Sequence, residues 1–149
     1  MIEHLIALIF LLLISIVDIF TFNKEGKGIP SALTTLFVIL MFLLTFSHGS
    51  FHIEIILFSI LIGLFLMDIS FFMGLADLKV LVGLSFFFNS FWEFSVFTAV
   101  SCLLYSIMVI YVKKNPKKYK TQFMPYVPFL FLTYVIFLTY EIIHQGVLF

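Results

Sequence analysis

Apolar residues along the chain form six long runs separated by short polar segments. The runs cover residues 5–22, 29–46, 51–67, 77–88, 94–112 and 124–140. A membrane-spanning helix needs roughly 20 mostly apolar residues, and all the runs except the fourth approach that length. Glycines at 63, 74 and 83 are expected to break or thin the helices around the third and fourth runs. The pattern predicts an all-α, polytopic membrane protein with about six transmembrane helices.

Composition supports a membrane protein and excludes a soluble one. Hydrophobic residues make up 63% of the 149 residues, and charged residues make up 11%. Soluble domains are about 45–50% apolar and about 25% charged. A single cysteine, Cys102, excludes an internal disulfide and any multi-cysteine zinc site. Because the six runs occupy most of the chain, residues 1–149 are predicted to form one membrane-embedded domain.

The lysines predict how the chain is oriented in the membrane. All eight basic residues are lysines, and they lie in three alternate polar segments, 23–28, 68–79 and 113–120. Basic residues next to membrane spans favour the cytoplasmic side. We therefore expect a multi-pass protein of the cell (plasma) membrane, with these segments cytoplasmic and both termini external. The start Met-Ile-Glu-His is acidic, so the first run is expected to be a retained helix and not a signal peptide.

Three aspartates lie within or beside the apolar runs, towards the predicted cytoplasmic side. They are Asp18, Asp68 and Asp77. Ionisable residues in or beside membrane spans are costly, which makes each of them a functional candidate. Two carboxyl groups at one depth can share a proton and act together as the acid and base of an aspartic protease. The alternative is a carboxylate at a helix end, paired with lysine or solvated at the interface.

Two motifs surround Asp18 and Asp77. The stretch Ile29-Pro30-Ser31-Ala32-Leu33-Thr34 follows Asp18, and the stretch Gly74-Leu75-Ala76-Asp77-Leu78-Lys79 contains Asp77. Together they resemble the two signatures of the prepilin and preflagellin peptidases, which are GxGD-type membrane aspartic proteases. The resemblance covers about the first 85 residues. Ser31 stands where the family usually has Asn, and Ala76 stands where the motif usually has its second Gly.

The resemblance implies an activity and a set of site residues. It makes Asp18 and Asp77 the catalytic pair of an endopeptidase that removes the leader peptide of pilin-like precursors at the cytoplasmic face. It implies motif or substrate-binding positions as well: Gly74, Ala76, Lys79, Ile29 and Pro30. Small residues at 74 and 76 would let a substrate backbone approach the carboxyl groups. The implied site uses no metal and no other cofactor. The chain resembles the short, protease-only form, because it lacks the Cys-x-x-Cys insertion of the larger enzymes that also methylate their products.

Several alternatives stay open at this stage. The chain can instead be a non-enzymatic membrane protein, such as a small transporter or a pilus or secretion assembly subunit with structural aspartates. Lys79 can tune Asp77 electrostatically or extend to the lipid headgroups. His52 and Glu54 are expected to cap a helix end and not to bind metal, which needs three or four convergent ligands. The basic segment 113–120 favours a topology anchor on anionic lipid over a docking site. The expected partners are the lipid bilayer and precursor proteins, with no nucleic acid.

Overall fold

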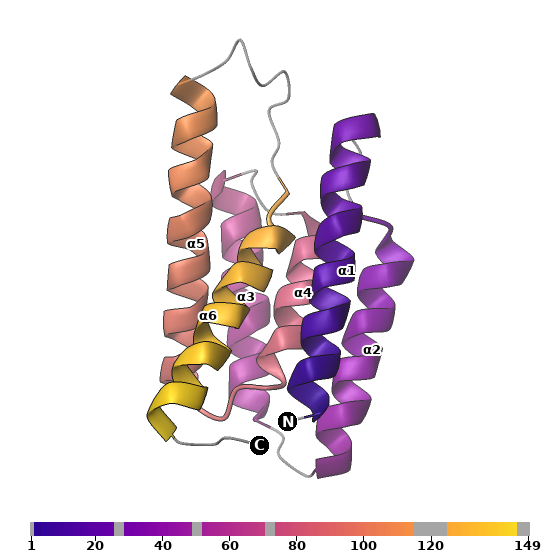
Figure 1. Cartoon of the computed structure of the whole chain (residues 1–149), viewed down its shortest axis with the longest axis vertical. Coiled ribbons are helices and arrows are strands. Elements are labelled where there is room, and N and C mark those ends of the chain that lie inside the picture. The colour runs from indigo at the N-terminus through magenta and orange to yellow at the C-terminus, as the bar shows by residue number, and fades with distance from the viewer. Residues whose placement is uncertain (1, 26–28, 49–51, 71–73, 115–124, 146–149) are drawn as a thin grey trace.

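The computed structural model describes residues 2–25, 29–48, 52–70, 74–114 and 125–145 (Figure 1). Within these ranges all the regular secondary structure is α-helical. The helices are α1 (Ile2–Glu25), α2 (Ser31–His48), α3 (Ile53–Ser70), α4 (Leu75–Ser85), α5 (Phe91–Lys114) and α6 (Val127–Gln145). Successive helices run in opposite directions, so that α1, α3 and α5 end where α2, α4 and α6 begin (Figure 1). The predictions of an all-α fold and of a short fourth helix are confirmed in this part of the chain.

The short helix α4 forms the centre of the bundle. It packs against α2, α3 and α6, while α1 packs against α6 and α2, and α5 packs against α6 and α3. Six of its 11 residues are buried, and Leu75 is its one exposed large apolar residue. A central helix can be short because it need not reach either end of the bundle. Its first turn therefore lies below the ends of α1 and α5, inside the bundle (Figure 1).

The outer surface of the surrounding helices is apolar. Exposed large hydrophobic residues occur on all five of them, including Leu5 and Ile9 on α1, Leu61 and Phe65 on α3, and Leu103 and Ile107 on α5. Among the described residues, two helical segments are long and apolar enough to cross a membrane, Glu3–Thr21 and Phe91–Val112. Shorter apolar stretches occupy Ser31–Phe46 of α2 and Val127–Ile143 of α6.

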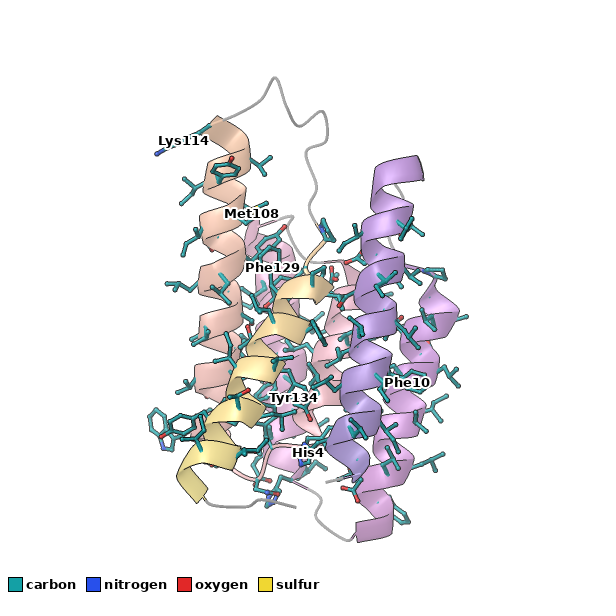
Figure 2. All side chains as sticks on the ribbon, viewed as in Figure 1. His4, Phe10, Met108, Lys114, Phe129 and Tyr134 are labelled. Carbon is teal, nitrogen blue, oxygen red and sulfur yellow. The ribbon has the colours of Figure 1, made fainter. Side chains whose placement is uncertain are left out.

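The two ends of the bundle differ in charge. The described lysines, Lys24, Lys79, Lys113 and Lys114, all lie at or near the end where α1, α3 and α5 finish, which we call the lysine end. Glu3, His4, His52, Glu54 and Glu93 belong to helix starts at the opposite end. Lys114 and His4 mark the two ends in Figure 2. The remaining lysines fall outside the described residues.

Two glycines behave differently from the prediction that they break helices. Gly63 lies within α3 and Gly83 within α4, and both helices continue through them. A Cβ on Gly63 would overlap the Leu78 side chain of α4, and one on Gly83 would lie 2.7 Å from Cε1 of Phe37 on α2. The missing side chains instead let α3 and α2 approach the central helix closely, as small residues do between membrane helices. Of these three predicted glycines, Gly74 is the one at a helix boundary, immediately before α4.

We expect Gly83→Ala to destabilise the protein by about 1–3 kcal/mol, because the new methyl group meets the ring of fully buried Phe37. The gain in helix propensity, at most about 1 kcal/mol, offsets only part of this cost. Gly63→Ala is the matched control. It meets the end of the more adaptable Leu78 side chain, so its effect should be smaller. Thermal unfolding in detergent measures both, and equal stability of Gly83→Ala and the parent protein would contradict the packing argument.

Candidate active site

Asp18 occupies a core position of α1. Ala7, Leu11 and Ile14 are fully buried and are spaced three or four residues apart, so they form the inward stripe of this helix. Asp18 continues the stripe by the same spacing, and its side chain is only 5% exposed. Helix α1 extends to Glu25, beyond the predicted end at residue 22. Asp18 therefore lies inside the helix, which argues against the alternative of a carboxylate at a helix end.

The two oxygens of the Asp18 carboxyl group differ: one accepts a hydrogen bond, and the other has no partner among the described residues. The backbone N–H of Val127, the first residue of α6, donates a hydrogen bond to this carboxyl group. Oδ2 is buried and has no hydrogen-bond partner among the described residues. A buried polar atom without a partner is costly. A hydrogen-bond donor from a water molecule or a substrate would therefore bind favourably to the unpartnered oxygen.

Asp77 lies in the first turn of α4 and bonds to the start of its own helix. Gly74 precedes the helix with an extended backbone, φ −89° and ψ 167°, and its N–H donates to Asp77 Oδ2 at 2.8 Å. This is half of a capping box, since Gly74 has no side chain to complete the reciprocal bond. A Cβ at Gly74 would make an ordinary contact of 3.5 Å with the same oxygen. Ala76 is helical, so alanine is accommodated there without backbone strain.

The fold brings the two carboxyl groups together. Asp18 and Asp77 interact electrostatically across the interior, although they come from α1 and α4. The hydroxyl group of Tyr105 on α5 interacts electrostatically with both of them. No hydrogen bond between described residues joins the carboxyl groups directly. They therefore form a loose pair, one buried and one half-buried, near the lysine end of the bundle.

Residues of α5 and the start of α6 form one wall of this site. Tyr105 and Tyr126 are both buried, and their rings meet edge to face with centroids 5.1 Å apart. The Tyr126 hydroxyl lies 2.8 Å from Ser101 Oγ and 3.5 Å from Cys102 Sγ. Sequence reasoning missed these residues. The available signal is the spacing of Ser101 and Tyr105, four residues apart on one face of an apolar helix.

Lys79 contacts α2 and makes no direct bond to Asp77. Its Nζ donates to Ser31 Oγ at 2.7 Å and to Thr35 Oγ1 at 2.8 Å. The serine in place of asparagine thus accepts a bond that ties the first turns of α2 and α4 together. Ile29 and Pro30 directly precede α2, with Ile29 buried and Pro30 exposed. Among the described residues, Lys79 thus links α4 to α2, and no hydrogen bond joins it to Asp18 or Asp77.

The other sequence candidates make no recorded interaction with the pair among the described residues. Asp68 is exposed near the end of α3. His52 Nδ1 lies 3.3 Å from Glu54 Oε1 at the start of α3, a polar interaction at a helix end. The described part of the chain contains no group of three or more His, Cys, Asp or Glu residues placed to hold a metal ion. Most of the basic segment 113–120 falls outside the described residues.

Comparisons with protein-family models, with curated proteins and with solved structures find no match to this chain. Assignment of a function therefore depends on the carboxyl pair and on the motifs around it.

Proposed function

We propose that the protein is a membrane aspartic endopeptidase that removes the leader peptide of pilin-like precursors. The observation that carries the proposal is that Asp18 and Asp77, from α1 and α4, interact electrostatically in the interior, with one Asp18 oxygen buried and unpartnered. The two aspartates are the same ones that stand in the peptidase-like motifs. Asp68, which matches no motif, is exposed and is not among the groups that act electrostatically on Asp18 or Asp77.

A multi-pass arrangement in the membrane is part of this proposal. The apolar outer surface is suited to lipid, and the central helix α4 is shielded from it by the others. The lysine end would face the cytoplasm, in accord with the preference of basic residues for that side. Six membrane passes would then leave both termini outside. The carboxyl pair would lie within the membrane domain, towards the cytoplasmic face.

The proposed chemistry needs one ionised and one protonated carboxyl group. The ionised group accepts a proton from a water molecule, whose oxygen attacks the scissile carbonyl carbon. The protonated group donates its hydrogen to the carbonyl oxygen, which gives a tetrahedral diol. The C–N bond then breaks, the leaving nitrogen takes a proton from the acid, and the diol collapses to the new carboxyl group. The group that took the proton from water gives it to the leaving nitrogen, and the collapsing diol returns one proton to the other group. The pair thus regains its single proton, and neither a metal ion nor another cofactor is needed.

The pair suits a substrate that has both a polar leader and an apolar helix. The apolar helix of a pilin-like precursor would lie along the outer helices in the bilayer, and its basic leader would stay at the cytoplasmic surface. Family resemblance suggests a cut after a glycine, immediately before the apolar helix. Closure of the loose carboxyl pair would follow from substrate binding.

A second candidate function is a non-enzymatic membrane protein with structural aspartates. One observation favours it: each carboxyl group accepts a backbone N–H at a helix start, Asp77 from Gly74 and Asp18 from Val127. Carboxylates stabilise helix N-termini in many proteins without any chemistry. Asparagine still accepts such a bond, so Asp→Asn variants separate the two functions.

Co-expression of the chain with a pilin-like precursor from the same genome tests the proposal. Loss of the leader appears as a faster-migrating precursor band on a gel. A precursor that stays full-length beside a folded, membrane-inserted chain would reject the peptidase.

We expect the rate of cleavage to follow a bell-shaped pH profile. At low pH both carboxyl groups are protonated and no base is present, whereas at high pH both are ionised and no acid is present. The two limbs belong to the coupled pair and not to either residue. Initial rates across the pH range, measured with purified protein, would show this profile. A rate that rises to a plateau with only one limb would contradict a two-carboxyl mechanism.

A further inference from the structure

The start of α6 is anchored to α5 by a buried hydrogen bond. Tyr126 is 3% exposed, and its hydroxyl group lies 2.8 Å from Ser101 Oγ, which is fully buried. Ser101 Oγ donates its own hydrogen to the Thr98 carbonyl at 2.9 Å. The Tyr126 hydroxyl must therefore be the donor to Ser101. Both groups are satisfied, and the bond joins the two helices in the interior.

Tyr126 also sets where α6 begins. Its carbonyl accepts the backbone N–H groups of Phe129 at 3.0 Å and of Leu130 at 3.3 Å, which start the helix. Pro128 has no N–H to donate. The Val127 N–H is thus the free donor in the first turn, and it bonds to the Asp18 carboxyl group. The residue anchored to Ser101 and the amide that holds Asp18 are neighbours in the chain.

Aromatic packing strengthens the same anchor. The Tyr105 ring meets the Tyr126 ring at 89° with centroids 5.1 Å apart, and it meets the Phe129 ring at 81° and 5.5 Å. Figure 2 places Phe129 in the first turn of α6. Tyr105 therefore packs against the start of α6, and its hydroxyl group interacts electrostatically with both carboxyl groups.

We propose that Ser101 and Tyr126 are positioning residues: their hydrogen bond fixes the start of α6, and with it the Val127 N–H that holds Asp18 beside Asp77. This inference rests on the proposed peptidase function. Neither residue touches the reacting atoms. They act through one backbone amide, and small displacements of a catalytic group reduce rates strongly.

Tyr126→Phe and Ser101→Ala each remove the anchoring bond. Tyr134→Phe is the matched control, since Tyr134, within α6, is likewise a buried tyrosine with a bonded hydroxyl group. Its partner is His4 Nδ1, 2.8 Å away, at the end opposite the lysine end (Figure 2). If the Tyr126 hydroxyl group had only a structural role, Tyr126→Phe and Tyr134→Phe would lower kcat to the same extent.

With purified full-length protein and a pilin-like precursor, Tyr126→Phe should lower kcat about tenfold and change KM by less than about twofold. Ser101→Ala should do the same, and the double variant should be no worse than either single one, because all three lose the same bond. Tyr134→Phe should keep kcat within about twofold of the parent protein. Equal kcat in Tyr126→Phe and Tyr134→Phe would overturn the inference.

A second readout does not require peptidase activity. A membrane-soluble carbodiimide reacts with protonated carboxyl groups, and the modification of Asp18 can be followed by peptide mass spectrometry. Loss of an N–H donor disfavours the ionised form, so Asp18 should react severalfold faster in Tyr126→Phe than in Tyr134→Phe. If the parent protein cleaves no precursor, the proposed function fails and this comparison still decides the inference. Equal labelling rates in the two variants would reject the positioning role.

Discussion

Asp18→Asn and Asp77→Asn are each expected to abolish cleavage of the precursor. An amide of nearly the same size cannot exchange protons with water or with the scissile carbonyl group. It can still accept the backbone N–H that each carboxyl group accepts, from Val127 and from Gly74. Loss of proton transfer by one positioned group costs roughly 10²–10⁴-fold in rate. Co-expression with the precursor and gel analysis of leader loss measures the effect.

Asp68→Asn is the control for these variants. Its side chain is exposed on α3, and it is not among the groups that act electrostatically on the pair, so the variant should keep most of the activity. Thermal unfolding in detergent should leave the Asp18 and Asp77 variants close to the parent protein. Full activity in the Asp18→Asn or the Asp77→Asn variant would contradict the catalytic assignment. Loss of folding together with loss of activity would favour the structural function of the aspartates.

Thiol labelling is expected to divide the chain into two sets of positions. In a Cys102→Ser background, Asn23→Cys and Asn115→Cys should react with an impermeant reagent only after the cells are opened. Ser47→Cys should react in intact cells. The expectation follows from the lysines, which adjoin the first two positions and are absent around the third.

Labelling of Asn115→Cys from outside would overturn the six-pass arrangement. It would also put the lysine end on the wrong side of the membrane for a cytoplasmic leader. Residue 115 lies outside the described part of the chain, so the expectation there comes from the lysine pattern alone.

The architecture could be predicted because membrane-type sequences mark their helices clearly. Long apolar runs and polar breaks give the six helices and the short α4 directly. The inward position of Asp18 could also be predicted, since Ala7, Leu11 and Ile14 precede it at helical spacing. The apolar runs did not predict the helix ends: α1 continues to Glu25, because polar residues can extend a helix beyond its apolar run.

The errors and omissions concern contacts between helices. Gly63 and Gly83 permit close packing on α4 and α2, which looks the same in sequence as a helix break. The sequence analysis missed Tyr105 and Tyr126, because these side chains come near the carboxyl pair only once α5 and α6 are packed together. Lys79 carries a charge suited to Asp77 or to lipid, yet it bonds to α2. Local spacing cannot decide such choices, because they depend on which helices become neighbours.

Intact-mass spectrometry of a purified precursor tests the central claim most directly. The precursor is incubated in liposomes with the full-length chain, and the same reaction is run with the Asp18→Asn/Asp77→Asn double variant. We predict one cut, immediately before the apolar helix of the precursor, with the mass of the leader lost only in the reaction with the parent chain. A precursor that keeps its full mass beside the folded parent chain, or that is cut equally by the double variant, would contradict the account.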